Sequence, residues 1–170
     1  TNEDGTMKKI VEKPSEPISK LANIGLYYIR DHELLFEGVR HTLASQPGPS
    51  GEFYLTDAFQ YMVDQGSRLI TAPVEGWWDA GKPETLLETN GHLLETRRGG
   101  VDSGAHVEGA EIVEPVRIEA GAHVHGGTIG PNVTLEAGAV AEGCELRDTV
   151  VGARTRLQSV RLHGSIVGAD

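Results

Sequence analysis

The feature that most constrains the fold is a 17-residue repeat that runs from Ser103 to the end of the 170-residue chain. Within each repeat the apolar positions lie five or six residues apart, whereas an amphipathic helix needs steps of three and four. Steps near six, with glycines between them, suit coils of three short strands whose inward side chains stack in one continuous core. We therefore expect a β-solenoid in which four valines, one repeat apart, form a buried column: Val116, Val133, Val150 and Val167.

Composition separates this repeat from the residues before it. Every Phe, Tyr and Trp lies at or before Trp78, and glycine is clearly more frequent after residue 98 than before it. A narrow solenoid core has room for aliphatic side chains but not for aromatic rings. The sequence therefore predicts two domains, residues 1–98 and residues 99–170. The single cysteine, Cys144, is expected to be a small buried residue of the second.

The first part has the pattern of an α/β domain. Residues 8–12, 21–29 and 69–74 are rich in aliphatic and aromatic side chains and predict strands. Asp31 is expected to cap a helix that ends before Pro47, because proline cannot continue a helix. Helices between such strands are typical of an α/β domain.

Two further helices are predicted before the repeat. Asp57 is expected to cap the first, with Gln60 as its capping-box partner, and Gly66 to end it. The second is expected to begin at Pro83, which suits the first helical position, and to end with basic residues that complement the helix dipole. Its predicted buried leucines and terminal arginines are Leu86, Leu87, Leu93, Leu94, Arg97 and Arg98.

Asp79 is the most informative candidate for a functional side chain. It lies in the stretch Gly76-Trp77-Trp78-Asp79-Ala80-Gly81-Lys82-Pro83-Glu84, after two tryptophans and before a glycine. We expect it at the end of a buried strand, on the turn that leads into the helix from Pro83. Ligands of open α/β sheets bind at such strand ends. The alternative is a solvated aspartate in an ordinary helix-initiating turn.

Charge and hydropathy exclude several classes of partner. The net charge of −10 argues against a basic nucleic-acid surface. No apolar run approaches the ~20 residues that a membrane-spanning helix needs. A single cysteine cannot form an internal disulfide, which fits a reducing compartment. We therefore expect a cytoplasmic protein that binds neither nucleic acid nor membrane.

Both parts of the chain resemble known families. The stretches Ile129-Gly130-Pro131-Asn132-Val133-Thr134 and Leu135-Glu136-Ala137-Gly138-Ala139 fit the hexapeptide repeat of left-handed parallel β-helices. Four motifs of the first part resemble, in order and approximate spacing, those of sugar-1-phosphate nucleotidylyltransferases, with glucose-1-phosphate thymidylyltransferase and its relatives the nearest likeness. The motifs are Glu12-Lys13-Pro14, Gly25-Leu26-Tyr27, Gly51-Glu52-Phe53-Tyr54-Leu55-Thr56-Asp57 and Trp78-Asp79-Ala80-Gly81. The resemblance implies a partial, Rossmann-like nucleotidyltransferase domain followed by a left-handed parallel β-helix.

The resemblance also implies a reaction. A nucleoside triphosphate and a sugar 1-phosphate give a nucleotide-sugar and pyrophosphate, with Mg²⁺ spreading the charge that develops at phosphorus. By analogy, Asp79 is the second of two aspartates that bind the magnesium ion. No residue of this chain is assigned a direct catalytic role.

The same analogy assigns the sugar phosphate to the first part of the chain. Glu12 would accept hydrogen bonds from sugar hydroxyls, and Lys13 would hold the sugar's phosphate as a point charge. The segment with Asn23, Gly25 and Tyr27 would line the sugar pocket, where glycine allows close approach.

One family feature has no counterpart in this chain. The family binds its triphosphate with a Gly-rich loop near the N-terminus, and the first metal aspartate follows that loop. The chain is therefore expected to be the sugar-binding half of a longer parent, inactive alone, and its base and sugar specificity stay open. Its strands would leave an open sheet edge, which favours self-association into a homo-oligomer of unknown order.

Two alternative functions concern the repeat. Hexapeptide helices often transfer acyl groups with a histidine as general base, and the candidates are His106, His123, His125 and His163. His106 and His123 are one repeat apart and should stack on one outer face. The other alternative is a purely structural, oligomerising solenoid, and this is the interpretation we favour for the second part.

Overall fold

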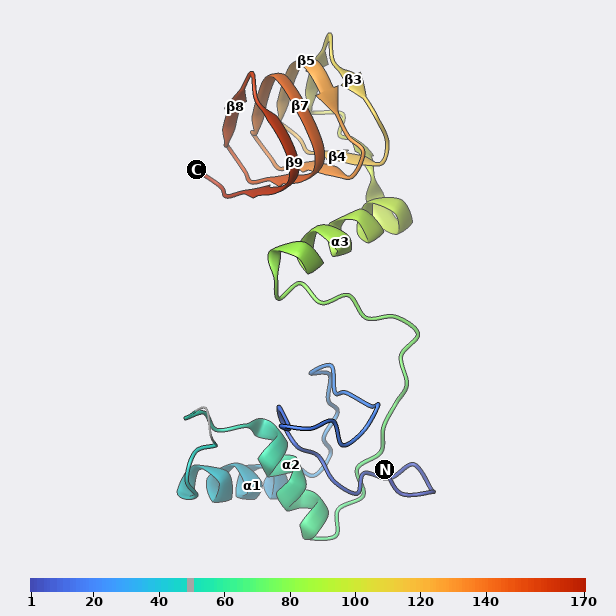
Figure 1. Cartoon of the computed structure of the whole chain (residues 1–170), viewed down its shortest axis with the longest axis vertical. Coiled ribbons are helices and arrows are strands. Elements are labelled where there is room, and N and C mark those ends of the chain that lie inside the picture. Colours follow the sequence, from blue (N-terminus) through green and yellow to red (C-terminus); the bar gives the residue numbers. More distant parts are fainter. Residues whose placement is uncertain (49–50) are drawn as a thin grey trace. The chain divides into compact units, whose positions relative to one another are not determined.

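The computed structural model describes residues 1–48 and 51–170, except for the side chains of residues 97 and 98. The chain divides into two compact units, Thr1–Trp77 and Trp78–Asp170, and each is described by itself (Figure 1). None of the helices in the described parts has the length and apolar character needed to cross a bilayer.

The second unit contains the predicted β-solenoid. Every pair of neighbouring strands in it is parallel, and successive coils are stacked along one axis (Figure 1). The strands are β1 (Gly100–Val101), β2 (His106–Glu108), β3 (Glu111–Ile112), β4 (Val116–Ile118), β5 (His123–Ile129), β6 (Val133–Leu135), β7 (Val140–Val151), β8 (Arg156–Gln158) and β9 (Arg161–Val167). The left hand of the helix, implied by the family resemblance, stays a prediction.

The spacing of the repeat is uniform only in the first coils. Val116 pairs with Val133, as the repeat predicts, but Val133 pairs with Thr149 and not with Val150. The difference arises at one corner, where three residues separate Ile129 from Val133 but only Arg147 and Asp148 separate Leu146 from Thr149. In the strands on either side of the shortened corner, the side chains keep the same inward and outward alternation, because the missing residue is taken from the corner and not from a strand.

The predicted column of four valines is therefore wrong beyond its first two members. The observed buried column is Val116, Val133 and Thr149, continued by Ser165, and the Thr149 hydroxyl donates a 2.7 Å hydrogen bond to the carbonyl of Arg147. Val150 points to the outer side, opposite Thr134 and Ile166. Val167 instead stacks on Val151, in the neighbouring column.

The solenoid core is aliphatic, as expected from the composition. The thiol of Cys144 is fully buried within it, which confirms the prediction of a structural cysteine. The buried members are Val116, Ile118, Ala122, Val124, Ile129, Val133, Leu135, Ala139, Ala141, Cys144, Leu146 and Val151.

Helix α3 (Pro83–Leu93) and the single π-helical turn η1 (Leu94–Arg98) pack on the outside of the solenoid. Pro83 is the first residue of α3, as predicted, and Thr85 Oγ1 accepts a hydrogen bond from the N–H of Lys82. Leu94 is 7% exposed and anchors the turn, whereas Leu93 is 48% exposed, so its predicted burial is wrong. The predicted contribution of the Arg97 and Arg98 side chains lies outside the described residues.

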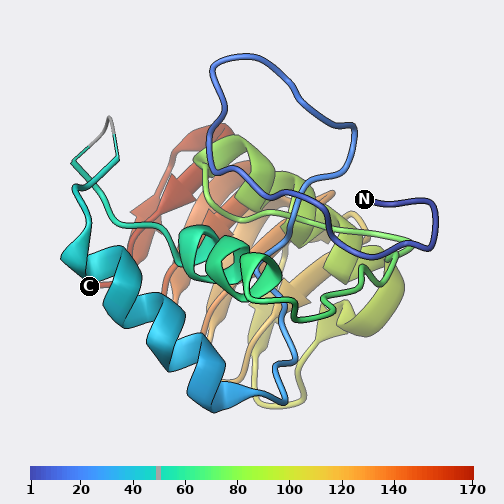
Figure 2. The same cartoon turned by 90° about the horizontal axis from the view of Figure 1, so that it is seen from below.

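The first unit is built around two helices that lie side by side, α1 (His32–Ala44) and α2 (Leu55–Asp64) (Figure 2). Gly38 lets them approach, because a Cβ there would lie 2.8 Å from the carbonyl oxygen of Ala58. Asp31 caps α1 by accepting a hydrogen bond from the N–H of Leu34, as predicted. The helix ends at Ala44, before Pro47.

Two predictions for the first unit are wrong. Within its described residues, 8–12, 21–29 and 69–74 form no strand, and one isolated bridge joins Thr6 to Ile70. A strand exists only where a neighbour accepts its hydrogen bonds, and the N–H of Ile10 instead donates to the Gln60 side chain. Gln60 is therefore not a capping partner of Asp57, and α2 begins before Asp57, at Leu55.

Candidate functional site

Lys13 has an unusual backbone conformation. Its φ angle is +45°, in the left-handed region that residues other than glycine rarely adopt. Such a conformation is maintained only where the surroundings hold it, and it is common at ligand sites. Pro14 follows directly and restricts the backbone further. The segment thus presents the Lys13 side chain from a fixed turn.

Two residues of the third family motif hold the Lys13 ammonium group. Its Nζ lies 3.1 Å from Oε2 of Glu52 and 5.3 Å from the centre of the Tyr54 ring. The Tyr54 hydroxyl donates to the same Glu52 oxygen, at 3.1 Å. The hydrogen bond to Glu52 raises the pKa of Lys13, and the charge of Glu52 raises it further, so the ammonium stays charged. Both members of the ion pair are more than half exposed and can exchange partners.

Asn23, Gly25 and Tyr27 form one hydrogen-bonded turn. Oδ1 of Asn23 accepts from the N–H of Gly25 at 3.3 Å and from the hydroxyl of Tyr27 at 2.6 Å. Gly25 has a φ angle of +77°, which its lack of a side chain permits. Asn23 thereby fixes both the backbone and the aromatic side chain of the predicted sugar-binding segment.

Tyr27 connects this turn to helix α2 and to the Glu12 segment. Its ring lies 4.6 Å from that of Phe59, which is buried on α2. Partial burial raises the pKa of the Tyr27 hydroxyl, and the negative charge of Glu12 raises it further. Of the six predicted site residues, the structure thus joins Asn23, Gly25 and Tyr27 in one turn, while Glu12 and Lys13 are neighbours in the chain.

Asp79 belongs to the second unit and lies in an exposed turn. The prediction of a buried strand before it is wrong, since Trp77 and Trp78 are about half exposed and extended without strand pairing. Oδ1 of Asp79 accepts a 3.1 Å hydrogen bond from the N–H of Gly81. A Cβ at position 81 would lie 3.2 Å from that same oxygen, so glycine gives the carboxylate its room.

The metal-binding capacity of the described residues is limited. No group of three or more His, Cys, Asp or Glu side chains within 1–48 and 51–170 is arranged to hold a metal ion. Asp79 thus offers a single carboxylate. That donor set suits Mg²⁺, which commonly takes one or two carboxylates and fills its other positions with water and substrate phosphate oxygens.

The four histidines proposed for acyl transfer are dispersed over the exposed surface of the solenoid. The rings of His106 and His123 are stacked, with their centres 4.6 Å apart, as the repeat predicts. Nδ1 of His125 lies 3.6 Å from Oε2 of Glu108, and Nε2 of His163 lies 3.1 Å from Oδ2 of Asp148. Such contacts are typical of solvent-exposed histidines on the outer surface of a solenoid.

Glu52 and Tyr54 are not among the site residues predicted from the sequence. Both are far from Lys13 along the chain, and a contact between such distant segments leaves no local pattern. The motif Gly51-Glu52-Phe53-Tyr54 was the available signal, because the resemblance already placed it beside the sugar-binding motifs.

Comparison with known proteins identifies the family. Residues 1–96 match the family described as nucleotidyl transferase. A glucose-1-phosphate thymidylyltransferase of Streptomyces antibioticus is 30% identical over 187 aligned positions, which cover 99% of this chain and 51% of that protein. The low-salt glycan biosynthesis nucleotidyltransferase Agl11 of Haloferax volcanii is 36% identical, with 64% of this chain and 30% of that protein covered.

A third relative is the bifunctional protein GlmU of Methanococcus aeolicus, 32% identical over 62% of this chain and 26% of its own length. The chain spans between about a quarter and a half of the length of these three relatives. The family match also includes α3, although this helix packs with the solenoid. The chain belongs to the nucleotidyl transferase family and joins part of that domain to a parallel β-solenoid.

Proposed function

We propose that this chain is the sugar-phosphate-binding part of an enzyme that makes a nucleotide-sugar. In the reaction, an oxygen of the sugar 1-phosphate attacks the α-phosphorus of a nucleoside triphosphate. The bond from that phosphorus to the β-phosphate oxygen breaks, and pyrophosphate leaves. The proposal concerns the whole protein that carries this chain, because the chain spans about half the length of the Streptomyces antibioticus relative.

Lys13 is the proposed phosphate-binding residue. Its ammonium is exposed and already holds an anionic partner, Glu52, from a backbone turn with positive φ. A phosphate dianion offers a stronger partner at the same place, so binding exchanges the carboxylate for the phosphate. This geometry is the observation that carries the proposal.

The turn of Asn23, Gly25 and Tyr27 is the proposed sugar-binding wall. The Asn23 amide NH₂ and the Tyr27 hydroxyl oxygen offer a donor and an acceptor to sugar hydroxyls, and Gly25 leaves the backbone open to close approach. The negative charge of Glu12 acts on the Tyr27 hydroxyl, and its carboxylate is the proposed further acceptor. These groups orient the sugar, while Lys13 holds its phosphate.

Asp79 is the proposed ligand of Mg²⁺. The ion, when bound, would neutralise charge on the phosphate oxygens during transfer. Asp79 contributes a carboxylate whose orientation is fixed by the Gly81 N–H. One carboxylate from this chain fits the family assignment of a second aspartate elsewhere in the protein.

The solenoid is proposed to be structural and to support a homo-oligomer. Its histidines are exposed, and the rings of His106 and His123 stack on one another on its outer surface. Nucleoside triphosphates are cytoplasmic metabolites, and we place the reaction in that compartment.

Binding of glucose 1-phosphate to the 170-residue chain tests this function. Isothermal titration calorimetry should show that Lys13→Gln weakens binding about tenfold, the effect of losing one charge-assisted hydrogen bond. Lys20→Gln is the matched control, since Lys20 is an exposed lysine of the loop that follows. Glucose without phosphate should bind the original chain and Lys13→Gln alike. Equal affinity of both lysine variants for glucose 1-phosphate would remove Lys13 from the site.

A further inference from the structure

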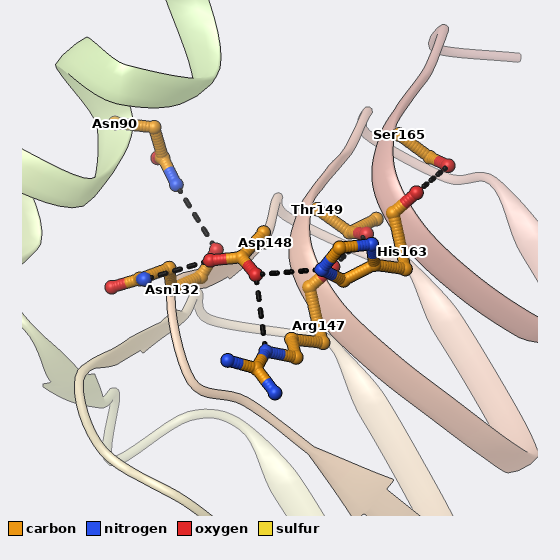
Figure 3. Close-up of polar contacts among 7 residues, drawn as sticks. All are labelled: Asn90, Asn132, Arg147, Asp148, Thr149, His163 and Ser165. Atoms are coloured by element: carbon orange, nitrogen blue, oxygen red, sulfur yellow. Dashed lines mark hydrogen bonds and ion pairs between the residues drawn. The ribbon is translucent and has the colours of Figure 1, made fainter.

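Helix α3 is fixed to the solenoid by one polar side chain, Asn90. Its Oδ1 accepts a 2.7 Å hydrogen bond from the hydroxyl of Thr134 on β6. Its Nδ2 donates to the carbonyl of Asn132 at 3.4 Å (Figure 3). Gly91, the next residue, lies beside the same corner, since a Cβ there would be in ordinary van der Waals contact with the Asn132 side chain, at 3.7 Å. Asn90 thus uses both halves of its amide to bind one corner of the solenoid.

That corner is itself cross-linked between coils. The Asn132 side chain donates to Oδ1 of Asp148 at 2.8 Å, and Oδ2 of Asp148 accepts from Arg147 and lies 3.1 Å from His163 (Figure 3). Asn132 and Asp148 both have positive φ, at 59° and 44°. The corner therefore joins three successive coils and gives Asn90 a rigid partner.

Other residues of α3 hold the segment with Asp79. The hydroxyl of Thr89, one residue before Asn90, lies 3.4 Å from the carbonyl oxygen of Asp79 and 2.8 Å from that of Thr85. The ring of His92 is stacked on that of Trp78, with centres 3.7 Å apart and planes 13° from parallel. The residues just before α3 are thus held by the same turns that Asn90 fixes to the solenoid.

We propose that the solenoid positions Asp79 through α3, with Asn90 and Thr134 as the positioning residues. The contacts form one continuous path from the corner of β6 and β7, through Asn90, to Thr89 and His92, and from these to Asp79 and Trp78. The solenoid then serves the reaction directly, by fixing a carboxylate that must meet phosphate oxygens. The catalytic part of this inference rests on the proposed function of Asp79.

Small displacements at such a site have large effects. A shift of about 1 Å in a positioned group can reduce turnover by two orders of magnitude. Asn90 and Thr134 are partly buried, so removal of one leaves the other short of a partner and loosens the helix. Removal of either side chain should therefore loosen residues 78–82 as well as the corner itself.

Hydrogen exchange of the 170-residue chain tests the positioning without any assay of activity. Thr134→Val and Asn90→Leu should each accelerate amide exchange across residues 78–93 by roughly 2- to 10-fold, the range for one lost hydrogen bond. Exchange in β5 should not change. Thr128→Val is the matched control, because Thr128 is also an outward threonine but bonds to Glu111, away from α3.

Two further variants separate positioning from general destabilisation. Asn90→Asp keeps the acceptor for Thr134 but loses the donor to the Asn132 carbonyl, so compared with Asn90→Leu it should restore slow exchange only in part. The double variant Asn90→Leu/Thr134→Val should accelerate exchange no more than Asn90→Leu alone, because Asn90→Leu already removes the contact with Thr134. Unchanged exchange in residues 78–82 of both single variants, or acceleration equal to that of Thr128→Val, would overturn the proposal.

The catalytic consequence is measured in the whole protein that carries this chain. Thr134→Val should lower kcat about tenfold and raise the Mg²⁺ concentration needed for half-maximal rate, with less change in KM for the sugar 1-phosphate. Thr128→Val should leave all three at their original values. Loosened exchange with unchanged kcat and Mg²⁺ dependence would also overturn the proposal. A whole protein with no transferase activity would instead refute the proposed function, while the exchange data still decide whether α3 is positioned by the solenoid.

Discussion

The hydroxyl of Tyr27 donates a 2.6 Å hydrogen bond to Oδ1 of Asn23, four residues earlier in the chain. The same oxygen accepts from the N–H of Gly25, so a single amide sets the geometry of the whole turn. Tyr27 also packs on Phe59 of α2, which ties the turn to the core of the first unit. The proposed sugar wall is therefore rigid before any ligand arrives.

The first prediction concerns the titration of Tyr27. Its pKa is raised by partial burial and then by Glu12, so a spectrophotometric titration should contain a component above the ordinary tyrosine pKa of about 10. Tyr27→Phe should remove the late component, and Glu12→Gln should shift it to lower pH. Tyr28→Phe, at the exposed neighbouring position, should leave it in place.

The same shift has a consequence for stability. Because the folded chain holds the Tyr27 proton more tightly, this contribution is complete below the unfolded pKa of about 10 and is lost as pH rises through the higher folded value. Urea unfolding of the original chain and of Tyr27→Phe should therefore converge at strongly alkaline pH. A constant difference across this range would contradict the assignment.

The second prediction tests the observed register. Val133→Asp places an unpaired charge in the solenoid core and should lower the free energy of unfolding by about 4 kcal/mol or more. Val150→Asp should cost less than half as much, because Val150 faces outward and is only partly buried. Urea unfolding followed by circular dichroism measures both. Equal losses would favour a register that is uniform in every coil.

The third prediction concerns Asp148. Partial burial alone would raise its pKa, but hydrogen bonds from Asn132 and Arg147, with the charges of Arg147 and His163, hold the pKa below its ordinary value. Asp148→Asn should lower the free energy of unfolding at neutral pH by about 1 kcal/mol. The depressed pKa means that this stabilisation is present above the unfolded pKa of about 4 and disappears as pH falls through the folded value.

Thermal unfolding at several pH values checks this prediction. The difference between the original chain and Asp148→Asn should shrink steadily in acid. Glu145→Gln is the control, because its ion pair with Arg161 is exposed and should matter little in salt. If the stability difference between the two proteins stayed constant down to about pH 2, the charge of the Asp148 carboxylate would not contribute to stability.

The fourth prediction concerns Asp79 in the whole protein. Asp79→Asn should keep the fold, because the side chain is exposed and similar in size, yet lower turnover by roughly two orders of magnitude or more as a metal-bound charge is lost. The KM for sugar 1-phosphate should change less, and excess Mg²⁺ should restore only part of the rate. A variant as active as the original would make Asp79 a helix-start residue only.

The fifth prediction concerns self-association. Leu26, Tyr28 and Ile70 are large apolar side chains that are mostly exposed on the first unit, and Ile166 is exposed on the solenoid. Such surfaces favour burial between copies of the chain. Light scattering at micromolar concentration should show a dimer or larger species. Leu26→Ser/Ile70→Ser and Ile166→Ser, compared with each other, identify the surface, and a purely monomeric original chain would refute the prediction.

The solenoid could be predicted because its apolar spacing is local and repeated. Its exact register could not, because Arg147 and Asp148 replace a three-residue corner and an alignment without gaps pairs Val133 with Val150. Thr149 is polar and was not an obvious core residue, although its hydroxyl is satisfied by the carbonyl two residues before it. The sequence therefore indicates that Thr149 is buried only once the position of the corner is known.

The first unit shows the opposite limit. Helix α1 could be predicted from its Asp31 cap, since the cap and the N–H that it binds are close neighbours in the chain. The extended residues 8–12 and 21–29 have strand composition, but composition cannot supply a neighbouring strand. The Lys13–Glu52 pair was likewise hidden, because it depends on a contact between distant segments. Family resemblance, rather than local pattern, indicated the residues of the candidate site.

The short corner at Arg147 and Asp148 also says where this solenoid can change length. Removing one residue from a strand would turn its inward side chains outward, whereas removing one from a corner leaves the facing of both flanking strands intact. Corners are thus the places where insertions and deletions can accumulate without loss of the core. Comparisons among solenoids of this kind should allow gaps at corners and none within strands, and a repeat length counted in residues is a poorer guide than one counted in coils.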